Sequence, residues 1–175
     1  FLSDALTLEA GKEIEKAVAE KKPFYLNMAH YAVHSPFETD ERFISHYTDP
    51  NKSQQARAFA TLIEGMDKSL GDILDKLEDM GIAENTLIIF LGDNGGDAPL
   101  GDAADYGSSA PFKGKKGSEY EGGVRVPFIV SWAHPNPNNK FQKAYPIARN
   151  AIQTQMGTVM DIYPTVLSVA GVKPA

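Results

Sequence analysis

The residues best suited to chemistry lie in the glycine-rich stretch 92–96, GDNGG. Asp93 and Asn94 come directly after the apolar run 86–91, TLIIFL, which predicts a strand. In open α/β sheets, ligands bind beyond the carboxyl ends of strands. A carboxylate beside an amide oxygen offers the hard oxygen ligands that Ca²⁺ and Mg²⁺ prefer. The pattern indicates a cation site, and an ordinary Asp-Asn-Gly turn is the alternative.

A second stretch, residues 113–125, interleaves cationic side chains with glycines. Ammonium groups and backbone N–H groups can both approach a tetrahedral anion closely in such a loop. A solvated basic loop is the alternative explanation. As an anion site, this stretch would bind substrate through Lys113, Lys115 and Arg125.

A histidine, His34, follows the run 24–28, FYLNM, which predicts a short strand. If that strand is parallel to 86–91, His34 lies at the same edge of the sheet as Asp93. An imidazole titrates near neutral pH and can donate a proton to a leaving group. A structural histidine is the alternative for His34, and more so for His30, four residues earlier.

Apolar residues at spacings of three and four predict helices over 3–20, 53–80 and 161–171. Gly81 and Gly171 are expected to end the last two, and Asp161 is expected to cap the third. The run 86–91 is continuous rather than alternating, which is typical of a strand buried on both faces of a parallel sheet. Residues 124–132 predict a further strand. The rhythm of helix, turn and strand indicates an α/β fold.

Composition narrows the function classes. The chain has 175 residues and a net charge of −6, which argues against general binding to nucleic acid. No apolar run approaches the roughly 20 residues of a membrane span. Cysteine is absent, so a disulfide, a zinc–thiolate site or a thiol nucleophile within these residues is excluded.

Four segments, in order, resemble the sulfatase family of the alkaline-phosphatase-like superfamily. Residues 23–36, PFYLNMAHYAVHSP, are similar to the family's PFFLYLAYYAPHTP. Residues 63–71 with 85–96 resemble IESMDDSIG…NTLVIFTSDNGG, and residues 116–127, KGSEYEGGVRVP, resemble KGTLYEGGIRVP. Residues 160–171, MDIYPTVLSVAG, resemble DLYPTLLDLAG. The resemblance covers nearly the whole chain.

This resemblance implies a three-layer α/β/α sandwich of the alkaline-phosphatase-like type, present in part. It implies hydrolysis of a sulfuric ester in a sulfated carbohydrate or aryl sulfate. Asp93 and Asn94 would be two ligands of the active-site Ca²⁺ (or Mg²⁺). Lys116 and His34 would be catalytic groups that contact the sulfate.

The chain departs from the family pattern at the nucleophile. The family uses a formylglycine made from the first residue of a Cys/Ser-x-Pro-x-Arg motif, together with an acidic pair of metal ligands, and neither occurs here. Residues 1–175 are therefore expected to be part of a catalytic domain, inactive without an N-terminal half as its partner. The expected location is periplasmic or secreted, and residues 97–112 are expected to line the substrate cleft.

Three other interpretations remain open from the sequence. A phosphodiesterase or phosphonate hydrolase of the same superfamily would share the metal site and differ in its nucleophile. A non-catalytic module could recognise sulfated glycans through the lysines of 113–116 and His34. A pseudo-enzyme that never had the first half is the third.

Overall fold

Two long helices dominate the computed structural model, which describes residues 1–97 and 107–173. Helix α1 spans Leu2–Ala19 and α2 spans Gln54–Asp79, which confirms the helices predicted over 3–20 and 53–80. Ser53 caps α2 by accepting a hydrogen bond from the Ala56 N–H at 3.0 Å. Gly81 follows its end with φ +68°, a left-handed conformation that glycine adopts freely. In this part of the chain, no helix is both long and apolar enough to cross a membrane.

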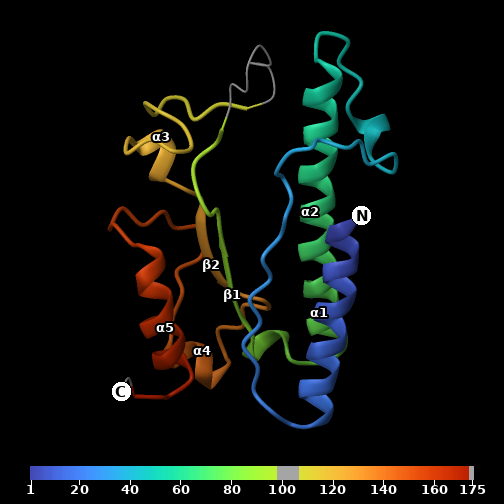
Figure 1. Cartoon of the computed structure of the whole chain (residues 1–175). Helices are drawn as coiled ribbons and strands as arrows, with labels where there is room; N and C mark the ends of the chain where they lie inside the picture. Colours follow the sequence, from blue (N-terminus) through green and yellow to red (C-terminus); the bar gives the residue numbers. More distant parts are fainter. Residues whose placement is uncertain (98–106, 174–175) are drawn as a thin grey trace.

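Helices α1 and α2 pack side by side and run in the same direction (Figure 1). The Oγ1 of Thr7 lies 2.5 Å from the Oγ of Ser69, and about two turns further along both helices Glu15 forms an ion pair with Lys76. The core lies at the C-terminal end of this pair, in a cluster formed by Ala10, Ile14, Ile73, Leu77 and Ala83. Burial of these apolar side chains holds the two helices together.

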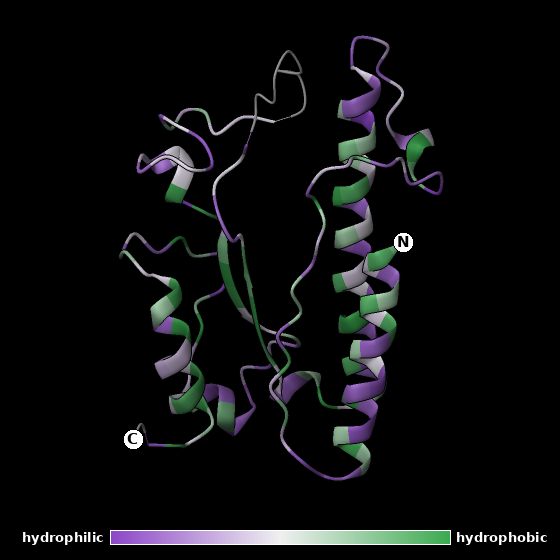
Figure 2. Ribbon diagram, in the orientation of Figure 1, coloured by the Kyte–Doolittle hydropathy of each residue, from purple (hydrophilic) through white to green (hydrophobic). Residues whose placement is uncertain are grey.

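The sheet of the described residues has two strands, β1 (Leu87–Leu91) and β2 (Phe128–Trp132). They pair antiparallel, with Leu87 opposite Trp132 and Leu91 opposite Phe128. The predicted strand over 86–91 is confirmed. The prediction that it pairs with a parallel strand is wrong, because its partner β2 is antiparallel. All five residues of β1 are only half-buried, so burial on both faces is also wrong for these residues. Both strands are strongly hydrophobic (Figure 2).

The second predicted strand, over 124–132, begins later than expected. Residues Glu121–Val124 form a short helix, α3, and β2 starts only after Pro127. A proline has no N–H to donate to a strand ladder, so it favours the first position of a strand or the residue before it.

The strand predicted over 24–28 is wrong. These residues pair with no strand among those described, although Met28 packs on the same core as Ile88 of β1. The segment rises from the end of α1 in the same direction as β1 (Figure 1). An extended segment becomes a strand only when a neighbour supplies the ladder of hydrogen bonds.

Shorter elements complete the fold: η1 (Ile44–His46), η2 (Ala83–Asn85), α4 (Lys140–Ala144), η3 (Val159–Asp161) and α5 (Ile162–Val169). Figure 1 shows β1 and β2 between α1 and α2 on one side and α5 on the other. Asp161 precedes α5 as expected, but its carboxylate accepts the Thr158 N–H at 2.7 Å instead of capping α5. The fold is thus a mixed arrangement of helices and strands.

Candidate functional site

The turn that follows β1 presents two oxygen-bearing side chains to solvent. Asp93 and Asn94 are both exposed. The Asp93 carboxylate accepts the Asn94 N–H at 2.9 Å, and the Asn94 Nδ2 donates to the Gly95 carbonyl at 2.9 Å. The second bond fixes the amide, so that its Oδ1 is the atom left for a cation. The donor set therefore suits a hard ion such as Ca²⁺ or Mg²⁺.

These two residues make up only part of a cation site. Over residues 1–97 and 107–173, no group of three or more His, Cys, Asp and Glu side chains is arranged to hold a metal ion. A calcium ion takes six to eight oxygen ligands. Asp93 and Asn94 fit such an ion as partial ligands, and its remaining ligands must come from water or from groups outside these residues.

Backbone hydrogen bonds, each with a glycine as donor or acceptor, join this turn to the basic loop and to α3. The Gly95 N–H donates to the Gly123 carbonyl at 2.8 Å, and the Lys116 N–H donates to the Gly96 carbonyl at 2.9 Å. The Gly122 N–H donates to the Lys113 carbonyl, also at 2.8 Å. The turn 93–96, the loop 113–118 and α3 therefore form one unit, with the backbone of Lys116 beside the turn.

This packing depends on the absence of side chains. A Cβ on Gly95 would lie 1.9 Å from the Gly122 carbonyl oxygen, and a Cβ on Gly122 would lie 2.2 Å from that of Gly114. Sequence reasoning did not assign Gly95, Gly122 or Gly123 to the site. The paired glycines in GDNGG and EGGVR were the available signal, since adjacent glycines often mark close backbone approach.

All three predicted substrate-binding cations have protein partners. The Lys113 Nζ lies 3.9 Å from the centre of the Tyr120 ring, and the Lys115 Nζ lies 3.6 Å from the Asp97 Oδ1. Arg125 donates to Glu121 at 2.8 Å and stacks over the Phe112 ring at 4.6 Å. Lys116 differs: it is half-buried and forms no ion pair with any residue that the structure describes.

His34 is exposed, and its ring orientation is set by its own neighbour. Its Nδ1 lies 2.8 Å from the Ser35 carbonyl oxygen. A carbonyl can only accept, so Nδ1 carries a hydrogen and Nε2 is the atom free to bind or transfer a proton. No contact among the described residues joins His34 to Asp93 or Lys116. Its segment does run toward the same end of the molecule as β1 (Figure 1).

The Sulfatase family model matches residues 1–172. The chain belongs to the sulfatase family. It is 33% identical to N-acetylgalactosamine-6-sulfatase of Mus musculus over 173 residues, which are 99% of this chain and 30% of that protein. It is 32% identical to steryl-sulfatase of Homo sapiens over 173 residues, 97% of this chain and 26% of that protein.

Solved structures share this fold. Ps i-CgsB, determined in complex with k-i-k-neocarrahexaose, superposes with a TM-score of 0.84 at 28% identity and covers 100% of this chain. The PsFucS1 sulfatase from Pseudoalteromonas sp. superposes with a TM-score of 0.74 at 29% identity over 97% of it. This chain corresponds to 35% and 30% of those two proteins, so it spans about a third of each.

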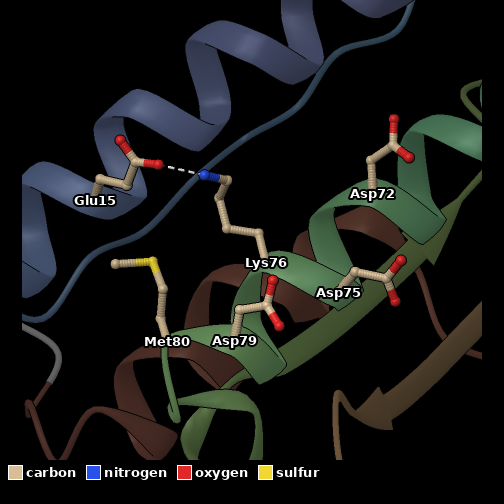
Figure 3. Close-up of a pocket in the computed structure, with 6 residues that line it drawn as sticks. All are labelled: Glu15, Asp72, Asp75, Lys76, Asp79 and Met80. Atoms are coloured by element: carbon tan, nitrogen blue, oxygen red, sulfur yellow. Dashed lines mark hydrogen bonds and ion pairs between the residues drawn. The ribbon is translucent and has the colours of Figure 1, made fainter.

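A second polar surface lies elsewhere, along the C-terminal half of α2. Figure 3 shows Asp72, Asp75 and Asp79 around a shallow pocket that Met80 and the Glu15–Lys76 ion pair also line. These carboxylates lie on one helix, away from the carboxyl end of β1. The lysine of this pocket, Lys76, is paired with Glu15, whereas Lys116 forms no ion pair with a described residue.

Of the stretch 97–112 that was expected to line the substrate cleft, residues 98–106 lie outside the described part of the chain. Within the rest, Asp97 contacts Lys115, and the Ser109 hydroxyl donates to the Gly122 carbonyl at 3.0 Å. Both ends of this stretch therefore attach to the unit that holds Lys116.

Proposed function

We propose that this chain supplies the cation-binding and oxyanion-binding part of a sulfatase active site, within a three-layer α/β/α sandwich to which it contributes a portion. One observation carries the proposal: backbone hydrogen bonds made by glycines hold the Asp93–Asn94 turn against the Lys116 loop and α3, in a chain that matches the sulfatase family over residues 1–172. We infer that the two groups most useful at a sulfate, oxygen ligands for a cation and an ammonium group, act side by side there.

The chemistry of a sulfate ester explains this choice of groups. Hydrolysis gathers negative charge on the sulfate oxygens and on the leaving alkoxide. A Ca²⁺ or Mg²⁺ ion held by Asp93 and Asn94 would supply fixed positive charge. The Lys116 ammonium adds a second positive charge in a half-buried place, where electrostatic attraction is stronger than in bulk water.

His34 is proposed as the group that protonates the leaving oxygen. Its Nδ1 hydrogen is engaged by the Ser35 carbonyl, so the proton to be transferred sits on Nε2 of the imidazolium. The bond to Ser35 orients the ring without another side chain. Leaving groups of high basicity, such as sugar hydroxyls, depend on this proton more than nitrophenolates do.

The nucleophile lies outside these residues in this proposal. The 175 residues contain no cysteine, so a formylglycine made from cysteine must come from another segment. We accordingly expect the 175-residue chain by itself not to hydrolyse sulfate esters. Lys113, Lys115 and Arg125, each oriented by a neighbouring ring or carboxylate, are proposed to contact the rest of the substrate.

A sulfated carbohydrate is the proposed substrate class. Its support is that relatives are named N-acetylgalactosamine-6-sulfatase, and that a similar structure was solved with k-i-k-neocarrahexaose. The sugar hydroxyls beyond the sulfate group would require further hydrogen-bonding side chains. Lys113, Lys115 and Arg125 are proposed to supply some of them.

The test uses the longest open reading frame that contains these residues, produced together with a formylglycine-generating enzyme. We expect hydrolysis of sulfated oligosaccharides and none of the corresponding phosphate esters. Lys116→Ala should lower kcat/KM about 10²- to 10³-fold, the usual effect of losing one preorganised charge. Lys140→Ala, an exposed lysine on α4, is the matched control and should leave kcat/KM unchanged.

Two further outcomes separate the alternatives. His34→Ala should reduce hydrolysis of a sugar sulfate much more than hydrolysis of nitrophenyl sulfate, since only the former needs a proton donor. Faster hydrolysis of phosphodiesters or phosphonates than of sulfate esters would favour the other superfamily activities. Tight binding of a sulfated glycan by the 175-residue chain alone, lost in Lys116→Ala, would favour a binding module.

A further inference from the structure

His30 lies in a hydrogen-bonded chain that links α1, α2 and the segment carrying His34. The Thr7 hydroxyl donates to the Ser3 carbonyl at 2.7 Å. Its oxygen lies 2.5 Å from the Ser69 Oγ, which in turn lies 3.4 Å from the His30 Nε2. Ser69 is buried, with 3% of its surface exposed, so this series of hydrogen bonds runs through the packed interface of the two helices.

The direction of these bonds follows from counting hydrogens. A hydroxyl has one hydrogen, and Thr7 uses its own on the Ser3 carbonyl. Ser69 must therefore donate its hydrogen to Thr7, and can only accept from His30. The Nε2 of His30 then carries the ring hydrogen. This assigns the tautomer of His30 from its surroundings.

The other ring nitrogen is consistent with a neutral imidazole. The His30 Nδ1 is buried, and none of the described residues forms a hydrogen bond with it. A second hydrogen there would place an unpaired buried donor and a positive charge in the interface, which is costly. Burial accordingly lowers the pKa of His30 below its ordinary value of 6.5.

The position of His30 relates it to His34. The His34 N–H donates to the Tyr31 carbonyl at 2.9 Å, closing a turn that begins directly after His30. Tyr31 and His34 are both exposed, whereas Ala32 and Val33 between them are half-buried. Beyond the turn, Phe37 meets Phe59 of α2 edge to face at 5.3 Å between ring centres. The turn is thus fixed to α2 on both sides, by His30 and by Phe37.

We propose that His30, as the neutral tautomer with its hydrogen on Nε2, is a positioning residue that fixes the turn bearing His34 against helices α1 and α2. The role of His30 in catalysis rests on the proposed function of His34. The tautomer of His30 and its anchoring of the turn do not depend on that function. His30 touches no proposed substrate group and acts only through the backbone of residues 31–34.

The first test measures the tautomer in the 175-residue chain labelled with ¹⁵N. The NMR spectrum of His30 is expected to show a protonated Nε2 and an unprotonated Nδ1 at neutral pH. A hydrogen on Nδ1 would overturn the proposal. This measurement needs no substitution, so it does not depend on whether a variant folds.

The second test compares amide hydrogen exchange at His34 between variants. His30→Asn and Ser69→Ala remove the bond and should speed exchange at this amide roughly fivefold, the effect of losing one typical hydrogen bond. His30→Gln, whose amide can still reach Ser69, should restore slow exchange. His46→Gln is the matched control, because His46 is exposed and bonds to Glu64 instead, at 2.8 Å. Unchanged exchange in both His30→Asn and Ser69→Ala would overturn the proposal.

The third test uses the active protein described above. His30→Asn should lower kcat and leave KM unchanged, and this loss should disappear in a His34→Ala background. A loss of the same size with and without His34 would show a general structural role and overturn the proposal. If the protein hydrolyses no sulfate ester at all, the proposed function fails, while the tautomer and exchange measurements still decide the anchoring.

Discussion

Replacing Gly122 with alanine sets two physical effects against each other at the candidate site. Gly122 lies in helix α3, where alanine is intrinsically favoured over glycine by about 1 kcal/mol. In the folded chain, however, the new Cβ would lie 2.2 Å from the Gly114 carbonyl oxygen and 2.7 Å from that of Lys113. Favourable contacts need about 3.5 Å, so the backbone of 113–114 must move by roughly 1 Å or more.

We expect the clash to dominate. Overpacking of this kind costs about 1–3 kcal/mol, and the 2.8 Å bond from the Gly122 N–H to the Lys113 carbonyl must lengthen as well. Gly122→Ala should therefore lower the free energy of unfolding and speed hydrogen exchange at the Lys116 amide, which belongs to the same unit. Urea denaturation and NMR-detected exchange measure the two effects.

Gly71→Ala is the matched control. Gly71 also lies in a helix, α2, but a Cβ there would meet no atom within 4 Å. The same substitution should here raise the free energy of unfolding by about 0.5–1 kcal/mol. If Gly122→Ala stabilised the chain as Gly71→Ala does, with the Lys116 amide still protected, the close packing of the glycine unit would be refuted.

Two further predictions concern acid stability and metal binding. Hydrogen bonds from Arg42 hold the pKa of the buried Asp40 carboxyl below its ordinary value of 3.8. The stabilisation from this pair is therefore complete above about pH 4, and it is lost as the pH falls through the lowered pKa. The difference between the urea midpoints of the wild type and Asp40→Asn should accordingly stay constant from pH 6 to about pH 4 and shrink as the pH falls further. A difference that does not shrink below pH 4 would contradict this assignment. Calorimetry should show only weak Ca²⁺ binding by the 175-residue chain, because two protein ligands leave most coordination positions of the ion to water. Binding should be weaker still in Asp93→Ala. A sub-micromolar dissociation constant for the wild type would contradict this expectation.

The helices could be predicted from the sequence because their signals are local. Apolar spacing fixes the extent of α2 to within a residue or two, and Ser53 and Gly81 mark its ends through their own chemistry. The strand at Leu87–Leu91 is equally evident from its composition. These patterns depend on neighbours within one or two turns of chain.

The errors arise where the structure depends on partners distant in sequence. Residues 24–28 have the composition of a strand but lack a partner among the residues described, and the direction of β2 relative to β1 is not encoded in either strand alone. The role of Gly122 was missed for a related reason. A glycine in a loop suggests a turn, and only the folded chain shows that another carbonyl occupies the space of its side chain.

Asp93, Asn94, Lys116 and His34 are proposed to face one cation and one sulfate group. Titration of the ¹⁵N-labelled chain with Mn²⁺ in the presence of inorganic sulfate tests this arrangement, since this paramagnetic ion broadens NMR signals only near its binding site. Signals of all four residues should broaden together, and Asp93→Ala should abolish the effect. Broadening at Asp72, Asp75 and Asp79 of the acidic pocket, with the signals of Lys116 and His34 unaffected, would contradict it.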